Sequence, residues 1–260
     1  MNKIIFLIAF CSPFFCNAQL LVQQDLSTFT TGIQLSGQGI WTNNSSLPGG
    51  AGVATAGGAN AKIVVLPMNY LDYGSSVNSM EIKPNSDACG FPFTPVTTGD
   101  LYVGFVINLS ATQVNNNSDF FRILSGSNFN TSARFYATPL SAFDFTIGVA
   151  KGANGNPIAT APVSLAYEQD HLIVVKYSQL SGVNDDTVSV YIDPVFVLGM
   201  PATPTMIATS GADQSGSIDR LYVRQNWTNG MPTGRLGLVS VSKTWAGLPL
   251  WNYRRQLSKK

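Results

Sequence analysis

Apolar and polar residues alternate with a period of two along much of the chain. In residues 187–193, Val188, Val190 and Ile192 alternate with polar or half-polar side chains, and residues 143–149 repeat the pattern. A period of two places successive side chains on opposite faces of a β-strand. Both segments therefore predict strands with one buried face and one face toward solvent.

Further apolar segments predict more strands, and turn-rich stretches such as "SGSNFN", "KGANGNP" and "SGVNDD" separate them. The only candidate helices are short, such as the segment around 166–169. Many medium-length strands without helical periodicity are typical of an antiparallel β-sandwich. We therefore predict an all-β jelly roll of two stacked sheets. The further strands are expected at 101–108, 119–124, 133–138, 171–177, 218–225 and 236–242.

The start of the chain has the pattern of a secretory signal peptide. Lys3 precedes an apolar stretch from Ile4 to Phe15, and Ala18 is a small residue before the expected cut. We therefore expect residues 1–18 to be removed and the protein to be secreted, in the periplasm or outside the cell. No later stretch approaches about 20 uninterrupted apolar residues, so no membrane span is expected.

The remainder is predicted to form a single domain over residues 19–250. Residues 43–61 are rich in Gly, Ala and Ser. Too few residues precede them for a separate domain, so they are expected to form a long loop. Residues 251–260 are expected to form a basic C-terminal tail.

Seven segments occur in an order that resembles a known type of module: "GDLYVGFVINLSA", "SDFFRIL", "FDFTIGVAKG", "HLIVVKY", "GVNDDTVSVYIDP", "LYVRQNW" and "LGLVSVSKTWA". Over roughly residues 65–247 the chain resembles the concanavalin A-like (laminin-G-like) β-sandwich modules of secreted Bacteroidetes-type proteins. The resemblance implies two stacked antiparallel sheets and an accessory, non-catalytic role.

The chain departs from that pattern in two places. Gly237 stands where such modules usually carry an acid before their last strand, so no role tied to that acid is expected here. Relatives often continue into a C-terminal sorting domain, whereas this sequence ends at "WNYRRQLSKK". Surface attachment by that route is therefore not expected.

Charge and cysteine content exclude several functions. A net charge of +1 with 11% charged residues offers no basic field for nucleic acid. Two of the three cysteines lie in the expected signal peptide, which leaves Cys89 without a partner for an intramolecular disulfide. We expect Cys89 to be a small buried apolar residue, with a nucleophile or an intermolecular crosslink as the alternative.

Candidate catalytic groups are few. Hydrolysis of glycans usually needs two carboxyl groups across the scissile bond, but Glu81 and Glu168 are the only glutamates, and they lie far apart in the sequence. His171 is the only histidine and is expected to be an ordinary residue at a strand end. One cysteine and one histidine cannot supply a usual zinc site. We therefore expect a protein that is not an enzyme, with a divergent glycoside hydrolase as the less favoured alternative.

Calcium is the one cofactor that the sequence makes plausible. Asn184, Asp185 and Asp186 form the densest cluster of oxygen ligands, with Asp213 and Asp219 as further contributors. The alternative is that Asn-Asp-Asp is simply a turn, because short polar side chains bond to their own backbone. No other cofactor is expected.

An aromatic side chain in a polar loop suggests a ligand site. Trp227 lies in the turn-like segment "QNWTNG", and Asn226 and Tyr222 flank it. Sugar rings bind to flat aromatic surfaces with polar groups around them, whereas Trp245 is expected to fill the core. The function predicted from the sequence is a non-catalytic module that binds an extracellular polysaccharide or cell-surface glycan, or mediates adhesion. The alternative is a structural or protein-interaction domain without a small ligand.

Overall fold

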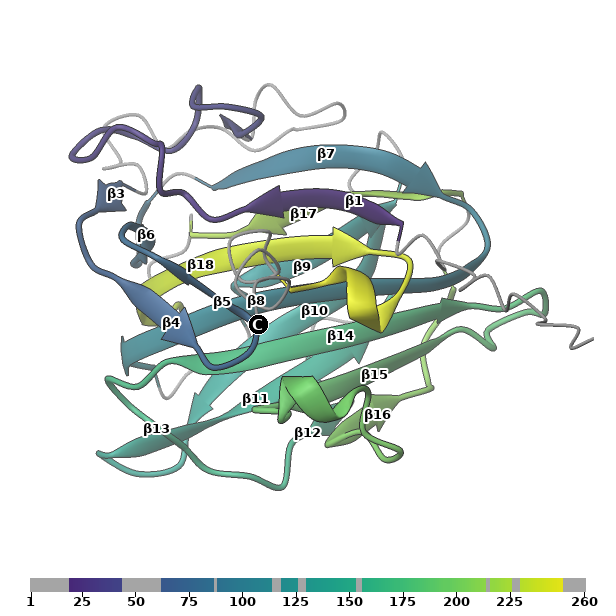
Figure 1. Ribbon diagram of the computed structural model, residues 1–260. Coiled ribbons are helices and arrows are strands. Elements are labelled where there is room, and N and C mark those ends of the chain that lie inside the picture. The colour runs from purple at the N-terminus through teal and green to yellow at the C-terminus, as the bar shows by residue number, and fades with distance from the viewer. Residues whose placement is uncertain are drawn as a thin grey trace, which may run out of the picture.

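The protein folds as a β-sandwich of two stacked antiparallel sheets (Figure 1), which confirms the predicted all-β class. The computed structural model describes residues 19–43, 62–86, 88–113, 118–125, 130–152, 156–213, 216–225 and 230–249. The expected signal peptide, nearly all of the 43–61 loop and the 251–260 tail lie outside these ranges. No helix in the described ranges is both long and apolar enough to cross a membrane.

The first sheet, here called the β8 sheet, is built around the longest strand. Its spatial order is β16 (Met206–Ala208), β15 (Thr187–Ile192), β14 (His171–Gln179), β8 (Gly99–Ala111), β18 (Thr233–Ser242), β6 (Ser79–Ile82) and β3 (Ile63–Val64). β1 (Leu20–Gln24) also pairs with β18.

The second sheet, here called the β9 sheet, stacks on the first. Its spatial order is β12 (Ala159–Thr160), β11 (Asp144–Lys151), β10 (Asn130–Pro139), β9 (Phe121–Ser125), β17 (Ile218–Val223), β7 (Cys89–Val96) and β2 (Thr42–Asn43). β13 (Leu165–Ala166) pairs with β11, and β4 (Met68–Tyr70) and β5 (Gly74–Ser76) form a separate hairpin.

The main core fills the space between the sheets with the inward residues of the alternating strands. At its centre the ring of Phe105 on β8 stacks on Phe121 of β9, with 4.1 Å between ring centroids, and meets Phe135 of β10 edge-on. Cys89 is buried in this core, as expected, with its Sγ 3.8 Å from the sulfur of Met80. The two sheets are thus joined by apolar contact.

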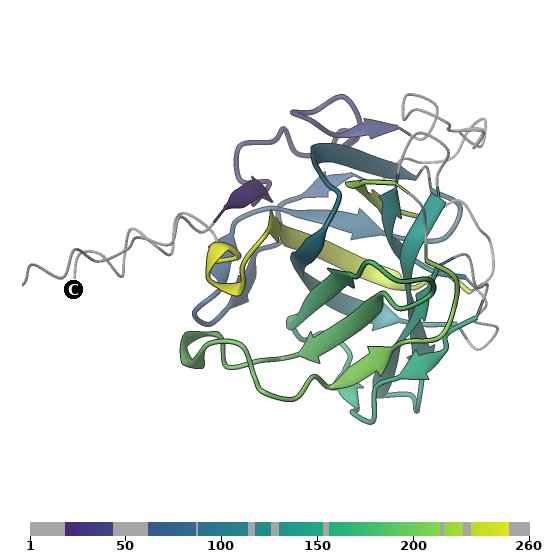
Figure 2. The ribbon, with the colours of Figure 1, turned by 90° about the vertical axis from the view of Figure 1, so that its right-hand side faces the viewer.

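A second apolar cluster covers part of the outer face of the β8 sheet. Phe196, in the short helix η2 (Phe196–Leu198), stacks on Trp245 in η3 (Trp245–Gly247), with ring centroids 4.8 Å apart. Tyr191 meets Trp245 edge-on, so Trp245 is buried as expected, though outside the sandwich. Figure 2 shows both short helices on the same side of the molecule.

The stacked phenylalanines make a prediction about stability. Phe105→Ala should lower the free energy of unfolding by about 3–5 kcal/mol, because it removes a buried ring and leaves a cavity between the sheets. Phe143→Ala is the matched control, since that ring is 81% exposed, and it should change stability by about 0.5 kcal/mol or less. Urea denaturation measures both, and equal effects would contradict this account of the core.

Candidate functional site

An open pocket of about 320 Å³ lies at one end of the outer face of the β8 sheet. Both glutamates of the chain, Glu81 and Glu168, line this pocket. Asn108, Ser110 and Arg235 add further polar groups. Val64 and Leu66 form an apolar side of the same pocket. The two glutamates lie far apart in the sequence, and the fold brings them to one pocket.

Strand register sets three of these side chains in a row. Arg235 on β18 pairs with Glu81 on β6 and with Asn108 on β8. The neighbouring residues in the strands, such as Ile107 and Leu236, belong to the core. Because side chains alternate between the faces of a strand, Glu81, Arg235 and Asn108 all face outward. The row is therefore a direct consequence of the register that buries the core.

Asp170 holds part of this row in position. Its Oδ1 accepts a hydrogen bond from Asn108 Nδ2 at 2.7 Å and lies 3.7 Å from Nη2 of Arg235. The backbone N–H of Asn69 donates to its Oδ2 at 2.8 Å. Asp170 thus restrains the side-chain amide of Asn108 and the guanidinium group of Arg235. On the other side of the row, Lys83 Nζ lies 2.8 Å from Oε2 of Glu81.

Glu168 reaches the pocket from a turn with unusual backbone geometry. Its φ is +60°, and its backbone N–H donates to the carbonyl of Leu109 at 2.8 Å. A left-handed conformation is uncommon for residues other than glycine and costs on the order of 1 kcal/mol or more. The segment around 166–169, named from the sequence as a candidate short helix, forms a turn instead, and this turn directs the second glutamate to the end of β8. Strain of this kind is often found at binding sites.

His171 fastens the same turn to the sheet. Its Nδ1 lies 2.7 Å from Oδ2 of Asp193, and its Nε2 lies 3.0 Å from the backbone carbonyl of Ala166. Burial alone would lower the pKa of His171, but the hydrogen bond and charge of Asp193 and the Ala166 carbonyl raise it above 6.5. A protonated ring donates from both nitrogens, so the side chain of His171 links Ala166 to Asp193 through hydrogen bonds.

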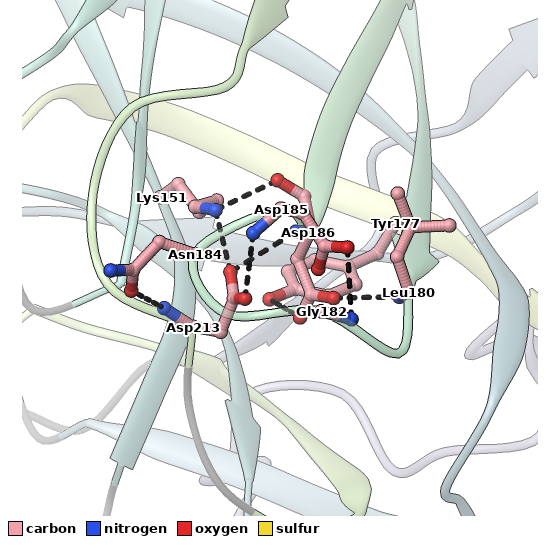
Figure 3. Close-up of polar contacts among 8 residues, drawn as sticks. All are labelled: Lys151, Tyr177, Leu180, Gly182, Asn184, Asp185, Asp186 and Asp213. Atoms are coloured by element: carbon pink, nitrogen blue, oxygen red, sulfur yellow. Dashed lines mark hydrogen bonds and ion pairs between the residues drawn. The ribbon is translucent and has the colours of Figure 1, made fainter.

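The structure brings the predicted calcium ligands together but places a lysine among them (Figure 3). Oxygens of Asp185, Asp186 and Asp213 lie within 4.8 Å of one another. Lys151 Nζ, fully buried, donates to Oδ1 of Asp213 at 2.6 Å and to the backbone carbonyl of Asp186 at 2.8 Å. The ammonium group of Lys151 thus gives these oxygens the positive charge that a bound calcium ion would otherwise supply. Asp219 forms an ion pair with Arg220 on β17.

Other donors surround the remaining oxygens of this cluster. Asp186 accepts from the hydroxyl of Tyr177 at 2.9 Å and from the N–H of Leu180 at 2.7 Å. Asp213 Oδ2 accepts from the N–H of Asp185 at 2.9 Å, and Asn184 Oδ1 accepts from the N–H of Asp213 at 3.3 Å. Asn184 has a φ of +59°. These contacts favour the turn interpretation, in which side chains bond to nearby backbone.

The predicted aromatic ligand site is only partly described. Tyr222 is 3% exposed and packs with Ala88 and Leu124, and burial raises the pKa of its hydroxyl. Its side chain therefore offers little surface to a ligand. Trp227 and Asn226 lie outside the described residues.

Comparisons with known proteins were made by sequence and by structure. No protein-family model matches the sequence, and no curated protein matches it significantly. One similar structure is domain 4 of AbnA, a GH43 extracellular arabinanase from Geobacillus stearothermophilus, in complex with arabinotriose. The sequence identity is 12% and the TM-score is 0.47, and the match covers 89% of this chain and 97% of that chain. Cellulose induced protein Cip1 shows 14% identity, coverage of 86% and 97%, and a TM-score of 0.45. At such similarity, function must be argued from this chain's own residues.

The lysine-centred cluster predicts a stability effect and a calcium response. Lys151→Met should cost about 3–5 kcal/mol of unfolding free energy, because it removes a fully buried ammonium group and leaves the partly buried carboxylate of Asp213 without its counter-charge. The control Lys176→Met breaks the more exposed pair with Asp100 and should cost about 1 kcal/mol or less.

In the unmodified protein, millimolar calcium should leave the melting temperature unchanged. A rise with calcium but not with magnesium would instead support the metal site.

His171 predicts a pH dependence of stability. Because its folded pKa is raised above that of the unfolded chain, its contribution is complete below about pH 6.5 and is lost as pH rises through the folded pKa. Denaturation at several pH values should show this decline in the unmodified protein and a flat profile over the same window for His171→Gln. No other histidine titrates in this range, so a decline retained by the variant would refute the assignment.

Proposed function

We propose that this protein is a non-catalytic module that binds an extracellular glycan in the pocket at the end of the β8 sheet. The observation that carries the proposal is the convergence of Glu81, Asn108, Glu168 and Arg235 on one open pocket. Its volume of about 320 Å³ falls within the range of small-molecule sites, roughly 300–1,000 Å³. The site is thus large enough for a short stretch of sugar.

The lining has the chemistry that a sugar requires. Hydroxyl groups both donate and accept hydrogen bonds, so the carboxylates of Glu81 and Glu168 suit them as acceptors and Arg235 suits them as a donor. Val64 and Leu66 offer an apolar surface to the C–H face of a ring. Asp170 limits the motion of Asn108 and Arg235 before the ligand arrives, which lowers the entropy lost on binding.

The location and partner belong to the same proposal. The signal-peptide pattern of residues 1–18 supports export, and a polysaccharide or cell-surface glycan is the polyhydroxylated polymer found there. The resemblance to concanavalin A-like modules supports the same class of ligand. A protein-interaction role without a small ligand is less well supported, because the open end of the sheet is hollowed and lined by polar groups.

A second candidate function is glycan hydrolysis, favoured by one observation. Both glutamates line the same pocket, and glycosidases use two carboxyl groups on either side of the scissile bond. Against it, Lys83 Nζ lies 2.8 Å from Oε2 of Glu81, so one oxygen of that carboxyl group is already engaged in an ion pair. We therefore place binding before hydrolysis.

A glycan array followed by titration of the best oligosaccharide tests the proposal. Arg235→Met and Glu168→Gln should each weaken binding by about 10-fold or more, because each removes a charged hydrogen-bonding group from the pocket. Asp100→Asn, at the opposite end of β8, is the control and should bind normally.

The same oligosaccharides, analysed for released reducing ends, separate the two functions. The binding proposal predicts no release. Release that both Glu81→Gln and Glu168→Gln abolish would establish hydrolysis instead. Failure of the unmodified protein to bind any glycan, or full binding by Arg235→Met, would refute the assignment of the pocket.

A further inference from the structure

Arginines gather on the outer face of the β9 sheet, opposite the pocket. The structure describes five arginines, and Arg235 is the only one on the β8 sheet. The other four alternate with core residues of β9, β10 and β17 and so face away from the core. They are Arg122, Arg134, Arg220 and Arg224. The whole chain carries a net charge of only +1, so this face concentrates positive charge.

Two of these arginines are direct neighbours across strands. Arg122 on β9 pairs with Arg134 on β10, and on its other side with Tyr222 on β17. Like charges directly opposite one another destabilise a sheet. The pair must therefore be offset by negative charge.

Asp119, which precedes β9 and is 1% exposed, supplies part of that charge. It accepts hydrogen bonds from Nε and Nη2 of Arg122, the latter at 3.0 Å. Arg224 Nη1 donates to its Oδ1 at 2.6 Å. Burial alone would raise the pKa of Asp119, but the hydrogen bond and charge of Arg122, with Arg224 and Arg134, lower it. The carboxylate is thus ionised and shared among three guanidinium groups.

Arg134 lies farther from Asp119 than the other two arginines do, and its side chain also has a hydrogen bond with Tyr136. Its Nη1 lies 4.0 Å from Oδ1 of Asp119, and its buried Nε has no hydrogen-bond partner. A buried polar group without a partner is uncommon and costly. Burial and the charge of Arg122 also lower the pKa of Arg224, even though Asp119 opposes this. One carboxylate therefore does not balance the three guanidinium groups.

We propose that Arg122, Arg134 and Arg224 form a binding site for an oxyanion, with Arg134 as its main donor. The ligand class is the sulfate ester or carboxylate substituent of an acidic polysaccharide. The planar guanidinium fork matches such groups with two parallel hydrogen bonds, and Arg134, the most exposed of the three side chains at 18%, offers its terminal nitrogens to the ligand. This site is separate from the pocket and stands whether or not the pocket binds glycan.

One residue that the sequence predicts to contact a ligand also lies on this face. Tyr222, predicted to contact a ligand, lies beside Arg122 in the sheet, and Asn226 and Trp227 follow Arg224 closely in the sequence. The sequence alone predicts a contact through aromatic stacking. The contacts in the structure point to charge instead.

Thermal unfolding in sodium sulfate, compared with sodium chloride at equal ionic strength, tests the proposal. Sulfate also stabilises proteins generally, so the measured quantity is the difference between variants. At ten times its dissociation constant, bound sulfate should raise the melting temperature of the unmodified protein by roughly 3–6 °C more than that of Arg134→Gln. Lys176→Gln, on the opposite sheet and outside both proposed sites, should keep the full increase. An equal increase in the unmodified protein and Arg134→Gln would overturn the proposal.

A conservative variant and polymer ligands complete the test. Arg134→Lys keeps the charge without the planar fork and should lose sulfate affinity several-fold while staying folded by circular dichroism. Unchanged affinity would contradict the role of Arg134. Binding to dextran sulfate would assign the sulfate ester and binding to polygalacturonate the carboxylate. Binding to neither, or equal binding to neutral dextran, would overturn the ligand class.

Discussion

The contact between the inner faces of the two sheets is the constraint on which the rest of this structure depends. Cys89 is the only cysteine in the described part of the chain, so the stacking of Phe105 on Phe121 and the aliphatic side chains around it must hold the sandwich together. A shift of one residue in any pairing would send the apolar side chains outward. The core therefore determines the register of the strands. That register determines which side chains lie next to one another on each outer face.

Both candidate sites are consequences of that register. On the β8 sheet it places Glu81, Arg235 and Asn108 in one row, and on the β9 sheet it sets Arg122 beside Arg134. The two faces differ in what surrounds these rows. The first is rimmed by carboxylates and an amide and is hollowed, which suits neutral hydroxyl groups. The second has three guanidinium groups around one buried carboxylate, which suits an anion. A glycan that carries acidic groups would satisfy both.

Local patterns in the sequence predicted what depends on local geometry. Alternation located the long strands well: the strand expected at 171–177 is found at His171–Gln179, and that at 101–108 at Gly99–Ala111. Strands of two to four residues, such as the one that carries Glu81, are too short to show a period. Glu81 and Glu168 line one pocket, and Lys151 bonds to Asp213, because the fold brings together segments that are distant in the sequence. A single sequence does not show which distant segments will lie side by side. The only available clue was that the chain has just two glutamates.

The most direct test of the central claim is to map where a bound oligosaccharide perturbs the backbone amide resonances of the protein. The account predicts that the largest shifts fall at Asn108, Ser110, Glu168, Thr233 and Arg235, which surround the pocket. Shifts confined to the turn at Asn184–Asp186, or to the outer face of the β9 sheet, would contradict the assignment of glycan binding to the end of the β8 sheet.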